Sequence, residues 1–117
     1  MMEEKITVAS MTIIMNAGDA RLFITEALGE IANANYEGAF QKIKDAQKKA
    51  TEAHKIQTDM IQGEARGEKM DYSLLFTHAQ DTLMTVNSEL IMAKQLIKVF
   101  ESMENRIAKL EKGESCR

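Results

Sequence analysis

The sequence predicts an all-α fold of three long helices. The chain of 117 residues contains no proline and only six glycines, so few positions interrupt a helix. Apolar residues recur at steps of three and four through three long segments, which is the spacing of one helix face. Two short stretches that contain asparagine or glycine, residues 33–35 and 63–69, separate the segments and predict the turns.

Length and charge restrict the class of protein. We expect a single domain, residues 1–117, because a chain of this length builds one modest core. A net charge of -3 and a pI near 5.4 argue against a nucleic-acid partner, which usually meets a basic surface. No apolar run has the length of a membrane span, and no signal-peptide core is visible. With a single cysteine, Cys116, whose role stays open, these features predict a soluble cytoplasmic protein.

The first predicted helix spans residues 4–32. Small and branched residues alternate along its apolar stripe, which allows another helix to approach closely. The stripe consists of Ile6, Ala9, Ile13, Ala17, Ala20, Ile24, Ala27 and Ile31. A short turn is expected at residues 33–35.

The second predicted helix spans residues 36–64. Its apolar stripe consists of Tyr36, Ala39, Phe40, Ile43, Ala46, Ala50, Ala53, Ile56 and Met60. Lysines and acidic residues occupy the other side, which is typical of a solvated face. Gly63 and Gly67 then mark the clearest break in the chain.

The third predicted helix spans residues 71–112, and Asp71 or Ser73 is expected to cap its start. Its apolar stripe consists of Ala79, Leu83, Val86, Leu90, Ala93, Ile97 and Phe100. Alternating steps of four and three are typical of a left-handed helical bundle. The register then slips by one, to Met103, Ile107 and Leu110.

A second line of mixed polarity follows the same helix. It consists of Leu74, His78, Asp81, Thr85, Ser88, Met92 and Gln95, flanked by Leu75, Phe76, Met84 and Ile91. Between residues 70 and 88 only Asp71 and Asp81 carry a formal charge, fewer than on an ordinary exposed face. Because one bundle has one core, we expect other copies of the chain to cover these apolar groups, in a homo-oligomer whose third helices meet.

Asp81 creates an electrostatic problem in such an assembly. Symmetry brings one carboxylate from each chain close to the axis, and neighbouring like charges raise the pKa of a carboxyl group. Either some of the carboxylates stay protonated, or a hard divalent cation such as Mg²⁺ binds among them. The residues by themselves leave both outcomes open.

His78 is the main candidate for chemistry, because it lies three residues before Asp81 on one side of the helix. It can be a nucleophile, a proton carrier, a metal ligand or a half-buried residue paired with Asp81. A zinc site needs three or four ligands, and the other histidine is His54, which we interpret as a structural or surface residue. Without a nucleophile elbow or a glycine-rich phosphate loop, the remaining hypothesis is attack on an activated group that a partner delivers.

Several stretches resemble a known family. They are residues 13–21, 26–28, 36–40, 52–58 and, above all, the sequence Ser-Leu-Leu-Phe-Thr-His-Ala-Gln-Asp at residues 73–81 and its continuation through residue 85. Over nearly the whole chain they resemble the IIA component of the bacterial sugar phosphotransferase system, lactose/cellobiose family. The resemblance implies an antiparallel three-helix bundle, similar to a spectrin repeat, that assembles as a homotrimer.

The resemblance also implies roles for individual residues. His78 would accept a phosphoryl group from the phosphocarrier HPr and pass it to a cysteine of the cognate EIIB, which serves the membrane component EIIC during sugar uptake. Asp81 would lie at the trimer axis, where its copies can hold a magnesium-type ion. Gln80 is a candidate donor of a hydrogen bond to the phosphoryl oxygens, and so is Thr82.

Thr82 departs from the family pattern. The family usually has His-Ala-Gln-Asp-His, and here Thr82 replaces the second histidine, which puts in question any second imidazole beside the site. Cellobiose, chitobiose and lactose all agree with the resemblance, so the sugar stays open. The alternative function is a trimeric helical scaffold or adaptor without phosphotransfer.

Overall fold

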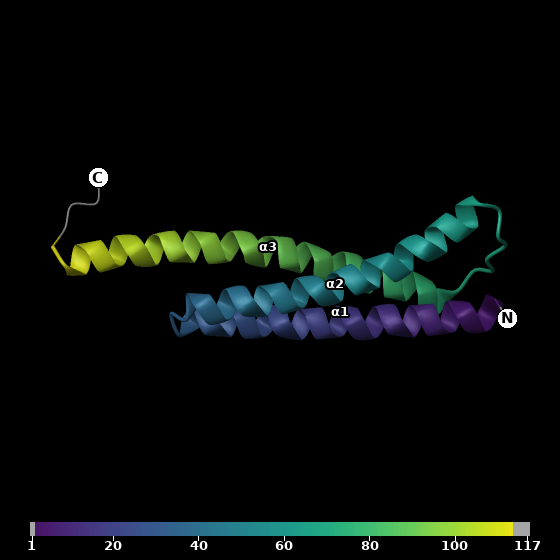
Figure 1. Ribbon diagram of the computed structural model, residues 1–117, viewed down its shortest axis with the longest axis horizontal. Helices are drawn as coiled ribbons and strands as arrows, with labels where there is room; N and C mark the ends of the chain where they lie inside the picture. Colours follow the sequence, from purple (N-terminus) through teal and green to yellow (C-terminus); the bar gives the residue numbers. More distant parts are fainter. Residues whose placement is uncertain (1, 114–117) are drawn as a thin grey trace.

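The structure, a computed structural model, describes residues 2–113 and contains three helices there: α1 (Met2–Ala32), α2 (Tyr36–Ala65) and α3 (Leu74–Glu111). They run up, down and up in a bundle of 67 × 23 × 18 Å (Figure 1). The predicted all-α, antiparallel three-helix fold is confirmed. Cys116 lies outside the described residues. None of the helices within residues 2–113 combines the length and hydropathy that spanning a bilayer requires.

Alanine-rich stripes hold α1 against α2. Ala17, Ala20 and Ala27 of α1 are completely buried, as are Ala39 and Ala46 of α2. Small side chains at these positions allow the backbones of the two helices to approach closely. The predicted α1 stripe is confirmed at every position but the last, since Ile31 is half-buried.

The turn between α1 and α2 depends on Asn35. Its Oδ1 accepts a hydrogen bond from the backbone N–H of Gly38 at 3.1 Å, which caps α2. A Cβ on Gly38 would lie 2.5 Å from Nδ2 of Asn35, so glycine leaves space for the cap. Ala34 takes a left-handed φ of 60° to reverse the chain. The asparagine-containing turn therefore lies where the sequence predicts it.

The start of α3 corrects the predicted boundary of residue 71. Ser73 has an extended backbone, with φ -135°, and its Oγ accepts a hydrogen bond from the N–H of Phe76 at 3.1 Å. Of the two candidate caps, Ser73 is therefore the one that begins the helix, and Asp71 lies in the preceding loop. The helix also ends one residue earlier than predicted, at Glu111.

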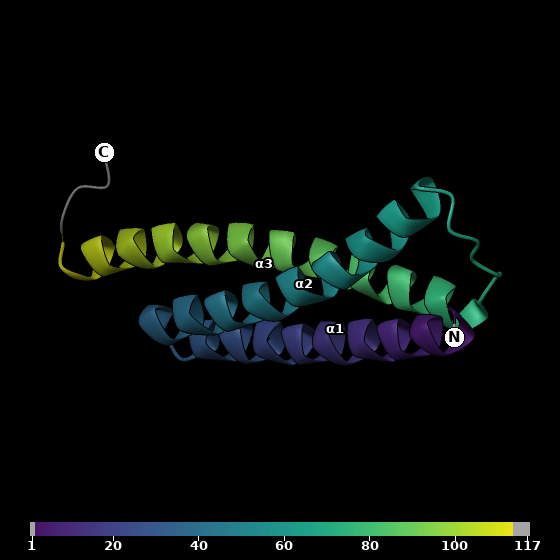
Figure 2. The same cartoon turned by 45° about the vertical axis from the view of Figure 1, so that its right-hand side comes forward.

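The far end of α3 extends past the other two helices (Figures 1 and 2). Ile97 is the last buried residue of the described chain. Phe100, predicted to continue the core stripe, is instead 42% exposed, because after Ile97 the half-buried side of α3 passes to Glu101. Tyr36, the first residue of α2, lies within the electrostatic influence of Glu101 and Glu104 at this end.

Candidate functional site

His78 is exposed on the second turn of α3, at the opposite end of that helix from its protruding terminus. Phe76, two residues before it, and Ala79, the residue after it, are buried against α1 and α2 in one half of the core. They fix the rotation of this turn, and the Ser73 cap fixes where it begins. The structure therefore presents an accessible imidazole on a rigid element.

The threonine hydroxyls near His78 are occupied by the backbone of α3. Thr82 Oγ1 donates to the carbonyl oxygen of His78 at 2.8 Å. Thr85 Oγ1 donates to the carbonyl oxygen of Asp81 at 2.9 Å. Such bonds to the preceding turn are common for threonine in helices. In this conformation neither hydroxyl donates to the imidazole of His78. Thr82 therefore does not take the place of the second histidine in the motif His-Ala-Gln-Asp-His.

Asp81 is also exposed, and its carboxylate forms no ion pair within residues 2–113. The local interpretation of His78, a half-buried ring paired with Asp81, is therefore not what the structure shows. Nor do the described residues contain a group of three histidine, cysteine or acidic side chains that can hold a metal. A cation at Asp81 would require carboxylates from several copies of the chain.

Gln80 lies on a different side of α3 from His78. It is half-buried and lines a cavity of about 170 Å³ beneath the α2–α3 loop, together with Met70 and Tyr72. Residues two positions apart on a helix do not face each other. Within one chain, the structure does not bring Gln80 and His78 together.

His54 is exposed on α2 and lines neither the cavity beside Gln80 nor the groove between α1 and α2. Its neighbours along the chain include Ala53 and Gln57, which are the buried positions of that turn. The structure agrees with its interpretation as a surface residue.

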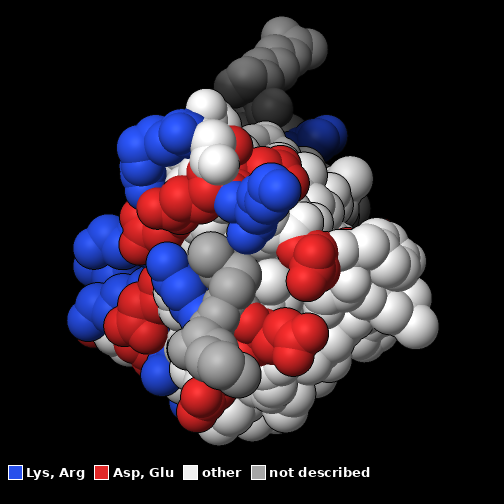
Figure 3. Space-filling view, turned by 90° about the vertical axis from the view of Figure 1, so that its right-hand side faces the viewer, with Lys and Arg blue, Asp and Glu red and all other residues white. Residues whose placement is uncertain are grey.

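The outward face of α3 has exposed apolar side chains among its polar ones, as the sequence predicts. Met92 is 59% exposed, and other large side chains of this face are similarly open: Leu74, Met84 and Ile91. Seen end-on, the molecule has charged side chains gathered on one side and a broad uncharged surface on the other (Figure 3). One predicted member is wrong: Phe76 is buried and packs in the same core cluster as Ala79 and Leu83.

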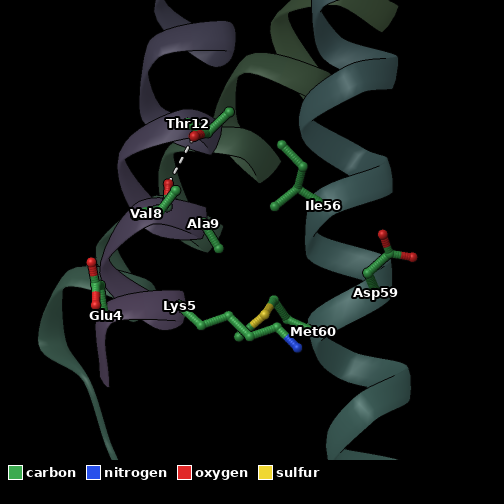
Figure 4. Close-up of a pocket in the computed structure, with 8 residues that line it drawn as sticks. All are labelled: Glu4, Lys5, Val8, Ala9, Thr12, Ile56, Asp59 and Met60. Carbon is green, nitrogen blue, oxygen red and sulfur yellow. Dashed lines mark hydrogen bonds between the residues drawn. The ribbon is translucent and has the colours of Figure 1, made fainter. Parts of the chain in front are cut away.

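A groove of about 530 Å³ opens between the start of α1 and the end of α2 (Figure 4). Its walls are Val8 and Ala9 on one helix and Ile56 and Met60 on the other, with charged residues at the rim. His78 and its neighbours do not line it. The sequence gives no signal for this groove, because it arises from the divergence of α2 from α1 (Figure 2).

A two-pronged ion pair joins α1 to α3 beside the outward face. Nε and Nη2 of Arg21 donate to the two carboxylate oxygens of Glu89 at 2.9 and 3.2 Å. The hydrogen bond to Glu89 raises the pKa of Arg21 above its ordinary value. The sequence does not predict this pair, because the periodicity of one helix does not show which charged residues on different helices contact each other.

Comparison with known proteins finds one family. The family model described as "PTS system, Lactose/Cellobiose specific IIA subunit" matches residues 8–101. The lichenan-specific phosphotransferase enzyme IIA component of Bacillus subtilis is 35% identical over 102 residues, which cover 87% of this chain and 93% of that protein. The lactose-specific EIIA component of Lactococcus lactis is 36% identical over 109 residues, which cover 93% of this chain and 100% of that protein.

Solved structures agree. The PTS cellobiose-specific enzyme IIA from Bacillus anthracis has a TM-score of 0.82 and 35% identity, over 86% of this chain and 93% of that one. An Escherichia coli protein, solved as a IIA(chitobiose)–HPr complex, has a TM-score of 0.74 and 30% identity. The match covers 85% of this chain and 96% of that one. The chain therefore belongs to the lactose/cellobiose-specific IIA family of the phosphotransferase system.

Proposed function

We propose that His78 accepts a phosphoryl group from HPr and passes it to a cysteine of the cognate EIIB. The observation that carries the proposal is an exposed imidazole, free of any ion pair within the described residues, on a rigid turn of a IIA-family chain. A relative of this family has been solved in complex with HPr, which supports HPr as the donor.

The chemistry suits the position of the ring. A neutral imidazole has a nitrogen lone pair, which can attack the phosphorus atom in line with the bond to the donor. A new P–N bond forms as the bond to the donor breaks, and a cysteine thiolate later takes the phosphoryl group by the same kind of displacement. An accessible ring allows both protein partners to reach the same atom in turn.

We further propose that the chain works as a homotrimer whose α3 helices meet around a three-fold axis. This arrangement would cover Met84, Ile91 and Met92, which a single chain leaves open. It would also bring three Asp81 carboxylates together. Carboxylate oxygens are suitable ligands for Mg²⁺, so a cation of this type is proposed at the axis.

In such a trimer Gln80 reaches the site from a neighbouring copy. Successive residues are about 100° apart around a helix, so His78 and Gln80 lie on opposite flanks of the direction in which Asp81 points. Around a three-fold axis, one flank of each α3 faces the opposite flank of the next α3. Gln80 of one copy therefore faces His78 of another, where its amide can donate to the phosphoryl oxygens.

The class of the transported sugar is inferred from the names of the relatives. Those names include lichenan, lactose and N,N'-diacetylchitobiose, and a solved relative is named for cellobiose. We propose a β-linked disaccharide, carried by a membrane EIIC while this chain acts on the cytoplasmic side of a bacterial membrane.

Intact-mass measurement tests the transfer. Purified protein is incubated with phosphoenolpyruvate, enzyme I and HPr, beside the His78→Ala and His54→Ala variants. We expect wild type and His54→Ala to gain the mass of one phosphoryl group and His78→Ala to gain none. No gain by a folded wild-type protein would contradict the proposal and favour the scaffold alternative.

A further inference from the structure

A groove between α2 and α3 lies in the half of the bundle that is far from His78. Its volume is about 560 Å³, which is within the range of cavities that bind small organic molecules. We call it the lysine groove. The residues that line it come from one short stretch of each helix: Phe40, Ile43 and Lys44 of α2, and Lys94, Gln95, Ile97 and Lys98 of α3.

The floor of the lysine groove is apolar. Ile43 and Ile97 are buried members of the core, whereas Phe40 is 40% exposed. The sequence predicts Phe40 as part of the core stripe of α2, and its exposure leaves an aromatic side chain open beside the groove. A ligand that covers Phe40 removes apolar surface from water, which favours binding.

The walls of the lysine groove are basic. Lys44, Lys94 and Lys98 line it without any acidic residue among the lining side chains of the described chain. None of the three lysines forms an ion pair within residues 2–113, although Nζ of Lys94 donates a hydrogen bond to Oε1 of Gln47. Three positive charges therefore gather at one groove of a chain whose net charge is -3. The groove in Figure 4, in contrast, has acidic residues at its rim.

An apolar floor beneath ammonium groups complements an amphipathic anion. Lys94 and Lys98 are one helical turn apart on α3, and Lys44 lines the same groove from α2. The three ammonium groups can therefore donate hydrogen bonds to one carboxylate or phosphate head group. A cationic ligand would be repelled by the same lysines, and a small anion without an apolar part would leave Phe40 in water.

The phosphotransfer partners do not need this groove. Lys94 follows His78 by 16 residues, about 24 Å along a straight helix. Lys94 also follows Met92 by two residues, about 200° around α3, so it leaves the helix nearly opposite the side that faces the proposed three-fold axis. A ligand of small-molecule size can thus enter between α2 and α3 without displacing a protein partner from His78.

We propose that the lysine groove binds an amphipathic anion of small-molecule size, with a carboxylate or phosphate monoester head at the lysines and an apolar chain or ring against Phe40. The inference goes beyond the proposed phosphoryl transfer and does not depend on it. The bound molecule would occupy the chain while the imidazole of His78 stays accessible.

Isothermal titration calorimetry of the wild-type protein tests the class of ligand. The probes are decanoate and decyl phosphate, each below the concentration at which it forms micelles. We expect saturable binding of one molecule per chain, and the tighter of the two probes identifies the head group. Acetate and inorganic phosphate lack the apolar chain, and decyltrimethylammonium lacks the negative charge, so all three should bind at least about tenfold more weakly.

Paired double variants test the place of binding. Lys44→Gln with Lys98→Gln removes two exposed lysines that form no ion pair within the described residues. Lys55→Gln with Lys109→Gln removes the same number of charges from helical positions outside the groove. We expect the first variant to bind decanoate and decyl phosphate at least about tenfold more weakly than wild type, and the second to match wild type. Circular dichroism checks that both variants are folded.

Three results would overturn the proposal. The first is the absence of saturable binding of either anionic probe to wild type. The second is equal binding of decyltrimethylammonium, which would make the groove merely apolar. The third is equal weakening in the two double variants, since net charge rather than the groove would then explain the loss. Wild type that sediments with phosphatidylglycerol vesicles but binds neither free probe would likewise contradict it, because a membrane surface would then be the ligand.

Discussion

The exposed position of His78 is set by residues that do no chemistry of their own. Its buried neighbours Phe76 and Ala79 orient the turn, and the Ser73 cap ties that turn to the loop. The sequence identifies His78 because the motif around it is distinctive. The sequence does not show that Gln80 lies on a different side of α3 from His78. A motif gives the order of residues along one chain and not which of them meet in space or across an interface.

Gln80→Ala should slow phosphoryl transfer to His78 about tenfold, because a hydrogen bond to a charged group is lost. If Gln80 acts from a neighbouring copy, mixed trimers with His78→Ala chains should recover part of the rate. In these mixed trimers, Gln80 of a His78→Ala chain can donate its hydrogen bond at His78 of a Gln80→Ala chain. Rapid-quench measurement of phosphoryl transfer in refolded mixtures gives both rates.

The matched control for this experiment uses chains that carry both His78→Ala and Gln80→Ala. They enter the same mixed trimers but bring no amide to the site. Equal rates in the two mixtures would mean that Gln80 does not act across the interface.

Asp81→Leu should stabilise the trimer when no divalent cation is present. It removes clustered negative charge at the proposed axis and adds apolar surface there. We expect Tm in EDTA to rise by about 5 °C or more. Millimolar Mg²⁺ should raise Tm of wild type and leave that of the variant unchanged. Loss of assembly in Asp81→Leu would instead mean that the carboxylates and their ion hold the trimer together.

At the scale of the helix, Ser73 decides where α3 begins. Ser73→Ala removes the side-chain acceptor for the Phe76 N–H and should lower the free energy of unfolding by about 1 kcal/mol. Asp71→Ala is the control, because Asp71 lies outside the helix and is expected to change stability little. Urea denaturation followed by circular dichroism measures both. Equal losses in the two variants would contradict the assignment of the cap.

Tyr36 links α2 to the far part of α3 and makes stability depend on pH. Partial burial, followed by the charges of Glu104 and Glu101, raises the pKa of Tyr36 above its ordinary value of about 10. The folded state thus binds the phenolic proton more tightly than the unfolded chain. The resulting stabilisation is complete below pH 10 and is lost as the pH rises through the folded-state pKa.

Tyr36→Phe should therefore lose less stability than wild type between about pH 9 and pH 11.5. Tyr72→Phe is the control, since Tyr72 is 82% exposed in the α2–α3 loop. Urea denaturation at the two pH values gives the difference. A pH dependence in Tyr36→Phe equal to that of wild type would contradict a raised pKa for Tyr36.

At the scale of the molecule, periodicity predicts the bundle but not its end. The stripes of α1 and α2 identify most buried positions, because nearly all their members face a neighbouring helix, although Phe40 is exposed. Gln57 is buried although it is polar, so hydropathy misses it. Phe100 fits the pattern of the core yet is exposed, because after Ile97 the half-buried side of α3 passes to Glu101, a charged residue that hydropathy does not identify.

The central claim is that His78 is the residue that accepts the phosphoryl group. The most direct test is a tryptic peptide map at alkaline pH of protein phosphorylated through enzyme I and HPr. Residues 70–94 form one tryptic peptide that contains His78, and residues 50–55 form another that contains His54. We expect the added phosphoryl mass on peptide 70–94, with fragmentation assigning it to His78. The phosphoryl group on peptide 50–55, or on any residue other than His78, would contradict the account.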